Sequence, residues 1–195
     1  MKEIVSVAAK FGFGEMIRDT KLGTFLGKFK KTHDIEQKPA KVRFRLALEE
    51  LGPTFMKLGQ VLSMRPDLVP PEWSEELANL QDNCPTVPWN EIKKELEKEY
   101  GAKIDELFAS IDETPIGDGS MAQVHKAIAK DGKHIVLKIL RPNIEKTVKS
   151  DLEVLEAIAT ILNNHGAKLG FDPKEVIDTF AEALDNELDL RHEAD

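Results

Sequence analysis

The sequence predicts an α+β protein in which a mainly helical region precedes a small antiparallel sheet. Up to residue 110, apolar side chains recur near the 3.6-residue period of an amphipathic helix. Two β-rich apolar runs then follow, at 121–129 and 135–140, on either side of an Asp-Gly pair that is typical of a two-residue hairpin turn. Helical periodicity returns after the second run and continues to the end of the sequence.

Proline and glycine mark the ends of the helices predicted in the first half of the chain. Gly52-Pro53 divides one long pattern into two helices, because proline inside a helix removes a hydrogen bond and clashes with the preceding turn. Asn90 is expected to cap a helix that Gly101 ends. The predicted segments are a broken helix at 3–30, a linker at 32–39, helical stretches at 40–51 and 53–61, and helices at 72–82 and 90–100.

Two further helices are predicted after the sheet. The first covers 143–162 and carries leucine and isoleucine on one face. The second begins at Pro173, which suits the first helical position because its missing N–H would have no partner there. Asp172, directly before it, is expected to be the N-cap.

Composition excludes several classes of protein. The 195 residues include 27 basic and 35 acidic side chains, a net charge of −8, which disfavours nucleic-acid binding. A single cysteine, Cys84, cannot form an internal disulfide or a cysteine metal site, and it indicates a reducing compartment. No run of about 18 apolar residues is present to span a bilayer.

The first 45 residues form a basic arm, with 11 basic and 5 acidic side chains. Basic and aromatic residues together suit contact with an anionic membrane surface. The alternative, which we favour, is a solvated helical arm that packs on the rest of the protein. The arm also carries Phe11, Phe13, Phe25, Leu26 and Phe29.

A glycine-containing loop precedes the β-rich region. Residues 117–124 read G-D-G-S-M-A-Q-V and fit G-x-G-x-x-A-x-V, in which protein kinases have a third glycine where Ala122 stands. Glycine lets the backbone approach nucleotide phosphates without a Cβ atom in the way. Because two glycines in a turn are more often only a turn, the loop alone does not establish nucleotide binding.

Lys138 strengthens the nucleotide hypothesis. It follows Val124 across the Asp-Gly turn, in a run I-V-L-K that resembles the V-A-I-K strand of kinases. A lysine in an apolar strand is costly unless its ammonium meets an anion, which in kinases is the nucleotide phosphate and a helix glutamate. The alternative is an edge-strand lysine that faces water.

The same loop also fits the dinucleotide fingerprint G-x-G-x-x-A of a Rossmann-type enzyme. Met121, Val124 and Ile128 are spaced as on one face of the helix that such a unit requires. Against this alternative, the strand before the loop would contain two acidic residues and Pro115, which do not suit a buried central strand. The acidic residue expected after the next strand is also absent, since Arg141 stands there.

Four motifs in order resemble those of the AarF/UbiB family of atypical kinase-like proteins, over about residues 45–195. Four motifs in the right order are far more specific than any one of them. The motifs are K-L-G-Q at 57–60 for K-x-G-Q, S-M-A-Q-V-H at 120–125 for S-I-A-Q-V-H, E-L-D at 187–189 for E-x-D, and R-H-E-A at 191–194 for R-R-E-A.

The resemblance implies roles for these residues. Lys57 would come from a helical extension that folds over the nucleotide pocket, where Glu187 and Asp189 would hold it. Lys138 would contact the phosphates and pair with Glu193 of a kinase αC-type helix. The residues implied for catalysis are Lys57, Gln60, Glu187 and Asp189, and those implied for nucleotide binding are Gly117, Asp118, Gly119, Ser120, Ala122, Val124, Lys138 and Glu193.

The resemblance also implies a division of the chain and a cofactor. A basic arm at 1–45 and a helical K-x-G-Q extension at 46–110 would precede a protein-kinase-like N-lobe at 111–195, cut off at its αC-type helix. The cofactor would be ATP or ADP with Mg²⁺. Neither H-R-D-x-x-x-x-N nor D-F-G occurs in the 195 residues, so the metal ligands are expected in a C-terminal lobe and this fragment alone is expected to be inactive.

At the level of function, the resemblance implies part of an atypical kinase or ATPase that supports biosynthesis of ubiquinone or another isoprenoid lipid. Its partners would be lipid-biosynthesis proteins or an anionic membrane surface. It would lie in the cytoplasm, with peripheral attachment to the inner face of the membrane as a variant. The first alternative is a non-catalytic, nucleotide-responsive binding module, and the second is the dinucleotide enzyme.

The loop departs from the alanine-rich form usual in that family. Asp118 stands between two glycines, where a polyphosphate would pass. A carboxylate a few ångströms from a phosphate repels it by about 1 kcal/mol or more, unless a lysine or metal intervenes. We therefore expect Asp118 to weaken phosphate binding and Lys138 to support it.

Overall fold

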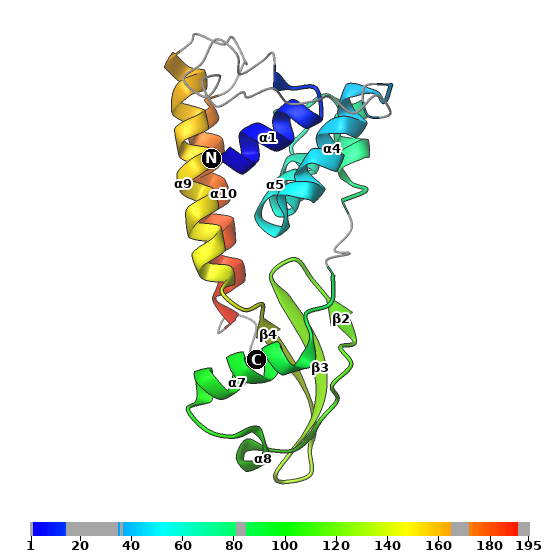
Figure 1. Ribbon diagram of the computed structural model, residues 1–195, viewed down its shortest axis with the longest axis vertical. Helices are drawn as coiled ribbons and strands as arrows, with labels where there is room; N and C mark the ends of the chain where they lie inside the picture. The colour runs from blue at the N-terminus through cyan, green and yellow to red at the C-terminus, as the bar shows by residue number, and fades with distance from the viewer. Residues whose placement is uncertain (1, 15–34, 36, 81–84, 165–171, 191–195) are drawn as a thin grey trace. The chain divides into compact units, whose positions relative to one another are not determined.

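The computed structural model describes residues 2–14, 35, 37–80, 85–164 and 172–190. The chain forms two compact units, each described here by itself (Figure 1). Residues 1–81 and 149–183 make a helical unit, and residues 82–148 and 184–195 make a unit that contains the sheet. The α+β class is confirmed. The predicted division at 45 and 110 stays a prediction.

The helical unit begins with a short helix that packs on a longer one. Helix α1, Lys2–Lys10, contributes Val7 to an apolar cluster with Phe11 and with Ala47 of α4, Ala40–Leu51. The Arg43 Nη1 donates to the Phe11 carbonyl at 2.7 Å. Phe11 and Phe13 of the basic arm therefore pack within the protein, whereas Phe25, Leu26 and Phe29 lie outside the described residues.

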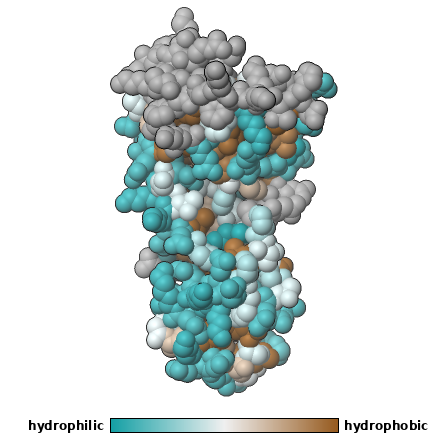
Figure 2. All heavy atoms as spheres, viewed as in Figure 1, coloured by the Kyte–Doolittle hydropathy of each residue, from teal (hydrophilic) through white to brown (hydrophobic). Residues whose placement is uncertain are grey.

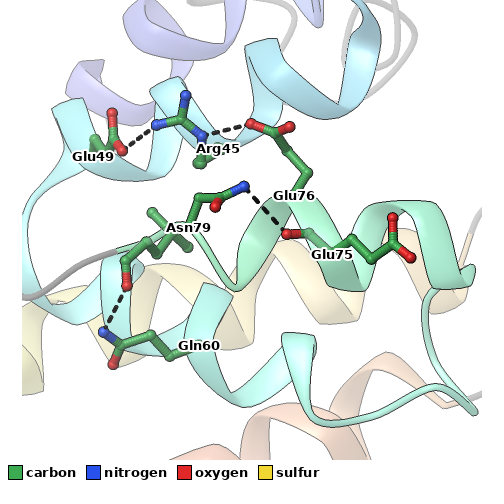
Figure 3. Close-up of polar contacts among 7 residues, drawn as sticks. Arg45, Glu49, Gln60, Glu75, Glu76 and Asn79 are labelled. Atoms are coloured by element: carbon green, nitrogen blue, oxygen red, sulfur yellow. Dashed lines mark hydrogen bonds and ion pairs between the residues drawn. The ribbon is translucent and has the colours of Figure 1, made fainter.

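The break at Gly52 separates α4 from α5, Pro53–Ser63, as the sequence predicts. Gly52 has φ +98°, a backbone angle that residues other than glycine rarely adopt, and Pro53 takes the first helical position. Helix α6, Pro71–Leu77, packs on both α4 and α5. Arg45 of α4 forms ion pairs with Glu49 and, at 2.6 Å, with Glu76 of α6 (Figure 3).

Helices α9, Ile144–Asn164, and α10, Pro173–Leu188, confirm the two predicted after the sheet. The Asp172 Oδ1 accepts hydrogen bonds from the Lys174 N–H at 2.8 Å and from the Asn163 amide at 2.9 Å. Asp172 is therefore the N-cap that the sequence predicts. Among the described residues, no helix is both long and apolar enough to cross a membrane.

One acidic side chain in the helical unit is held in an unfavourable environment. Burial raises the pKa of the Asp151 carboxyl on α9, and the charge of Glu3 adds to the rise. An acid with a raised pKa takes up a proton more readily in the folded state, so stability falls as pH rises from the unfolded pKa through the folded one. The full penalty is present near neutral pH.

We expect Asp151→Asn to raise the melting temperature near neutral pH, and the gain to shrink in acid, as the pH falls through the raised pKa of the native carboxyl. Thermal unfolding followed by circular dichroism at neutral and at acidic pH measures this. Glu153→Gln, at an exposed position on the same helix, controls for net charge. A gain in melting temperature that is the same at both pH values, or no gain at all, would show that the charged Asp151 carboxylate does not destabilise the fold.

The sheet is built around its longest strand. Strand β3, Ala122–Ala129, pairs antiparallel with β4, His134–Leu140, along almost its whole length. On the other edge of β3 lie β1, Phe108–Ile111, and β2, Gly117–Asp118. Gly132, with φ +86°, lies in the turn between β3 and β4, so the predicted hairpin is confirmed. The predicted two-residue turn is wrong, because residues 130–133 separate the two strands.

One face of the sheet is covered by helices. Helix α7, Trp89–Tyr100, and the short α8, Ile104–Leu107, contribute to the cluster beneath it, and α7 lies beside the strands in Figure 1. Gln123 and His125 of β3 are fully buried on this face. The outward side of α7 is charged and hydrophilic (Figure 2). The buried members of the cluster are Ile92, Leu96, Ile104, Phe108, Ala127 and Ile139.

Of the two predicted ends of α7, the C-terminal one is confirmed and the N-terminal one is wrong. Gly101 ends the helix in the left-handed conformation, with φ +63°, as predicted. The prediction that Asn90 is the N-cap is wrong, because the cap position is Pro88 and Asn90 lies in the first turn. Pro88 has φ −56° and ψ 138°, the extended backbone that leads into a helix.

Candidate functional site

The candidate site is the loop between β2 and β3. The Gly119 N–H donates to the Ala122 carbonyl at 2.9 Å and closes a tight turn over 119–122. A Cβ atom on Gly119 would lie 3.2 Å from that carbonyl oxygen, so a side chain would crowd the turn. A Cβ on Gly117 would make only ordinary contacts with Val124, at 3.7 Å. The geometry of the turn itself thus requires glycine at 119 more than at 117.

The loop forms one wall of a pocket of about 310 Å³. Ser120 and Lys138 bring a hydroxyl and an ammonium to this lining, which suits an anionic ligand, while Asp118 and Glu187 bring two carboxylates. All the nucleotide-binding residues implied by the family resemblance are brought together here, except Glu193, which lies outside the described residues. The lining residues are Gly117, Asp118, Gly119, Ser120, Met121, Ala122, Val124, Lys138 and Glu187.

Lys138 lies on the face of the sheet opposite to the one that α7 and α8 cover. It is paired across β3 and β4 with Val124, and both residues lie on the face opposite to buried Gln123 and Ile139. The side chain of Lys138 is exposed, so the expected cost of burying a lysine in an apolar strand does not arise. The apolar neighbours of Lys138 on β4 alternate with it and face α7 and α8, whereas Lys138 lies on the opposite face.

The residues implied for catalysis fall in different places. Glu187, in the last turn of α10, lines the pocket together with Lys138. Asp189 follows the helix, where its N–H donates to the Asp185 carbonyl at 3.1 Å, and it is not among the lining residues. Lys57 and Gln60 lie on α5 in the helical unit, so their placement relative to the pocket stays a prediction.

Within the helical unit, the K-x-G-Q segment has a packing role. The Gln60 Nε2 donates to the Leu80 carbonyl at 3.2 Å, which ties α5 to the chain after α6 (Figure 3). Gly59 is buried, and a Cβ there would lie 2.1 Å from Leu80 Cδ1 and 2.7 Å from Leu48 Cδ1. The absence of a side chain at Gly59 therefore allows this close approach.

Two residues near the loop were missed at the level of sequence. The Thr86 Oγ1 donates to the Asp118 Oδ2 at 2.8 Å, and the Arg141 Nη2 lies 4.0 Å from the Asp118 Oδ1. These partners are distant in sequence, and no local motif pairs them. Asp118 is consequently accompanied by a cation and a hydroxyl, not isolated between two glycines as the sequence suggested.

The strand after the loop decides against the dinucleotide alternative. A Rossmann unit would continue from the glycines into a helix, whereas here β3 follows and pairs antiparallel with β4. Met121, Val124 and Ile128 accordingly do not share a helix face. Within the described part of the chain, no group of three His, Cys, Asp or Glu side chains is placed to hold a metal ion.

The sequence signature of the ABC1 atypical kinase-like domain matches residues 79–195. An uncharacterized protein in the hydrogenase 1 5' region of Clostridium pasteurianum is 40% identical over 99% of this chain, which spans 34% of that protein. A "Probable protein kinase UbiB" from Marinobacter nauticus is 43% identical over 78% of this chain, which matches 28% of its length. The chain thus spans about a third of the length of the curated relatives it matches.

A solved structure shows a similar arrangement of the backbone. The complex of Rv3197 with erythromycin, from Mycobacterium tuberculosis, has a TM-score of 0.50 and 30% sequence identity. The match covers 81% of this chain and 40% of that one.

Proposed function

This chain belongs to the AarF/UbiB family of atypical kinase-like proteins, the family of the ABC1 domain, and we propose that its pocket binds the phosphates of ATP or ADP. The observation that supports the proposal most strongly is the convergence of the turn at 119–122, Lys138 and Glu187 on one pocket. A compact ammonium beside backbone amides is a common arrangement for binding phosphate.

The sheet face opposite to α7 and α8 would also offer a surface for the nucleotide base. Val124 lines the pocket opposite Lys138, and Val136, two residues before Lys138 on the same strand face, is 60% exposed. A large exposed apolar side chain beside a polar pocket suits the flat face of an adenine ring. The base would lie against the two valines while the phosphates point to the loop.

In this arrangement, each residue has a separate task. Lys138 would bind the phosphates as a point charge, and the loop amides would orient them. Glu187 would hold Lys57, and Glu193 would pair with Lys138, as the family resemblance implies. Bound Mg²⁺ would further neutralise the charge of the phosphates. Its protein ligands would lie outside the described residues, which contain no cluster that could hold a metal ion.

The activity of the whole protein is a wider proposal. By its family, we infer an atypical kinase or ATPase that supports biosynthesis of ubiquinone or another isoprenoid lipid. The basic arm at 1–45 would bring the protein to an anionic membrane surface from the cytoplasmic side. A non-catalytic nucleotide-responsive module is the second candidate. The pocket geometry supports both, and ATP hydrolysis by the full-length protein discriminates between them.

Calorimetric titration of the full-length protein with ATP–Mg²⁺, ADP and adenosine tests the proposed pocket. We expect ATP and ADP to bind and to compete with each other, and adenosine to bind more weakly because it lacks the phosphates that the loop and Lys138 contact. Binding of adenosine as tight as that of ATP would contradict a phosphate site. Absence of binding by all three would reject the proposed function.

The family role of Lys57 leads to a separate prediction. If Lys57 restrains the activity by occupying the nucleotide pocket, with Glu187 and Asp189 as partners, Lys57→Arg should change the rate of autophosphorylation or ATP hydrolysis in the full-length protein. The rate and the nucleotide affinity are both measured. If neither changes, Lys57 is a helix-surface lysine and the family role does not apply to this chain.

A further inference from the structure

We propose that Arg141 is a positioning residue for the phosphate-binding loop, acting from behind the loop without contacting the nucleotide. The inference rests on the proposed nucleotide site. Arg141 directly follows β4 and is absent from the lining of the pocket. Its side chain is only 11% exposed. Because arginine is rarely buried without specific partners, contacts that hold it in place are expected.

Arg141 binds the loop through both its backbone and its side chain. Its N–H donates to the Met121 carbonyl at 2.9 Å, and its Nε donates to the Gly119 carbonyl, also at 2.9 Å. The Ala122 carbonyl is taken by the Gly119 N–H. Three loop carbonyls, at 119, 121 and 122, are therefore bound within the protein, two of them by Arg141.

The contact with Gly119 sets the direction of a donor. A trans peptide group holds its C=O and its N–H on opposite sides, and the described chain contains no cis peptide. With the Gly119 carbonyl turned toward Arg141, the N–H of Ser120 points away from Arg141. Ser120 lines the pocket. Phosphate is attracted by N–H groups and repelled by carbonyl oxygens, so this orientation favours its binding.

Arg141 also joins the loop to the segment at 85–87. Its Nη1 donates to the Pro85 carbonyl at 2.9 Å. The same segment reaches the hairpin twice more, through Thr86 to Asp118 and through the Val87 N–H, which donates to the Gln123 Oε1 at 3.0 Å. The hairpin is thus bound to the segment at 85–87 at three points, one of which is the guanidinium of Arg141.

The guanidinium has a second effect on phosphate through Asp118. The Arg141 Nη2 and the Asp118 Oδ1 are buried, 4.0 Å apart, and neither has a hydrogen-bond partner among the described residues. The attraction between them compensates two charges that would otherwise be unpaired. Without Arg141, the carboxylate of Asp118 would face the pocket uncompensated and repel a bound phosphate.

Calorimetry on the full-length protein with ATP–Mg²⁺ and with adenosine tests the inference. We expect Arg141→Gln to weaken ATP binding by about tenfold, as for loss of one charge-assisted contact, and to leave adenosine binding nearly unchanged. Adding Asp118→Asn to Arg141→Gln should recover part of the ATP affinity. Lys94→Gln, exposed on α7, makes the same change of charge and should have no effect.

The possible failures are distinguishable. If the native protein binds ATP and Arg141→Gln binds it equally well, this inference alone is overturned. If Arg141→Gln loses ATP and adenosine to the same extent, Arg141 supports the fold in general, which also contradicts a positioning role. If the native protein binds neither ligand, the proposed function fails, and the inference about Arg141 fails with it.

Discussion

Lys138→Met should weaken binding of ATP–Mg²⁺ to the full-length protein by at least about tenfold, because it removes the ammonium of a residue that lines the pocket together with the loop. Methionine keeps most of the length of the side chain but cannot bind phosphate. Affinity for adenosine should change little, since Val124 and Val136 remain. Isothermal titration calorimetry with both ligands measures the difference.

Lys133→Met is the matched control for this variant. Lys133 lies in the exposed turn of the same hairpin, and its side chain is 79% exposed in an ion pair with Asp131. This change removes one positive charge from the same pair of strands without touching the pocket. Equal losses of ATP affinity in the two variants would show that only the net charge matters, and would contradict a specific role for Lys138.

Gly59→Ala is expected to destabilise the protein by about 1–2 kcal/mol. Overpacking a tight core costs about 1–3 kcal/mol, and the better helix propensity of alanine returns up to about 1 kcal/mol of that. The new Cβ would lie well inside contact distance of Leu80 and Leu48, which are both 3% exposed and have little room to move. Urea unfolding, with the midpoint and slope fitted together, measures the change.

A double-mutant cycle with Leu80→Ala isolates this contact. Leu80→Ala alone should be destabilising, because it removes buried side-chain volume. In that background Gly59→Ala should cost clearly less than it does alone, since the methyl group then has space. Costs that simply add would show that the crowding at Gly59 has no energetic effect. The glycine of K-x-G-Q would then need a different explanation.

The elements that were predictable from sequence are those with local causes. Gly52, the Asp-Gly turn and Asp172 each impose a backbone conformation or a hydrogen bond on their immediate neighbours. Gly52 and Asp172 act as predicted, and the Asp-Gly pair gives the predicted hairpin with a connection longer than two residues. Asn90 shows that a local preference can be overridden by a neighbouring residue. An asparagine is a good cap in general, but Pro88 already holds the extended backbone two residues earlier, and the helix begins there.

The parts of the site that could not be predicted depend on tertiary contacts. Alternation along β4 does not reveal which face α7 will cover, so the exposure of Lys138 could not be deduced from its apolar neighbours. The contacts of Arg141 with Pro85 and of Thr86 with Asp118 join residues 56 and 32 positions apart. Glu187 lies on α10, which begins well after the sheet in the sequence, and only the fold brings it to the pocket.

Binding of phosphates beside Lys138 can be tested with an acyl-phosphate derivative of ATP. An amine next to the terminal phosphate attacks the acyl carbonyl, forms an amide and releases the nucleotide, so the acylated lysine marks the phosphate site. The account predicts that mass spectrometry of the labelled full-length protein finds the acyl group on Lys138, and that excess ATP suppresses this modification. Labelling of other lysines with Lys138 unmodified, or labelling of Lys138 that ATP does not reduce, would contradict it.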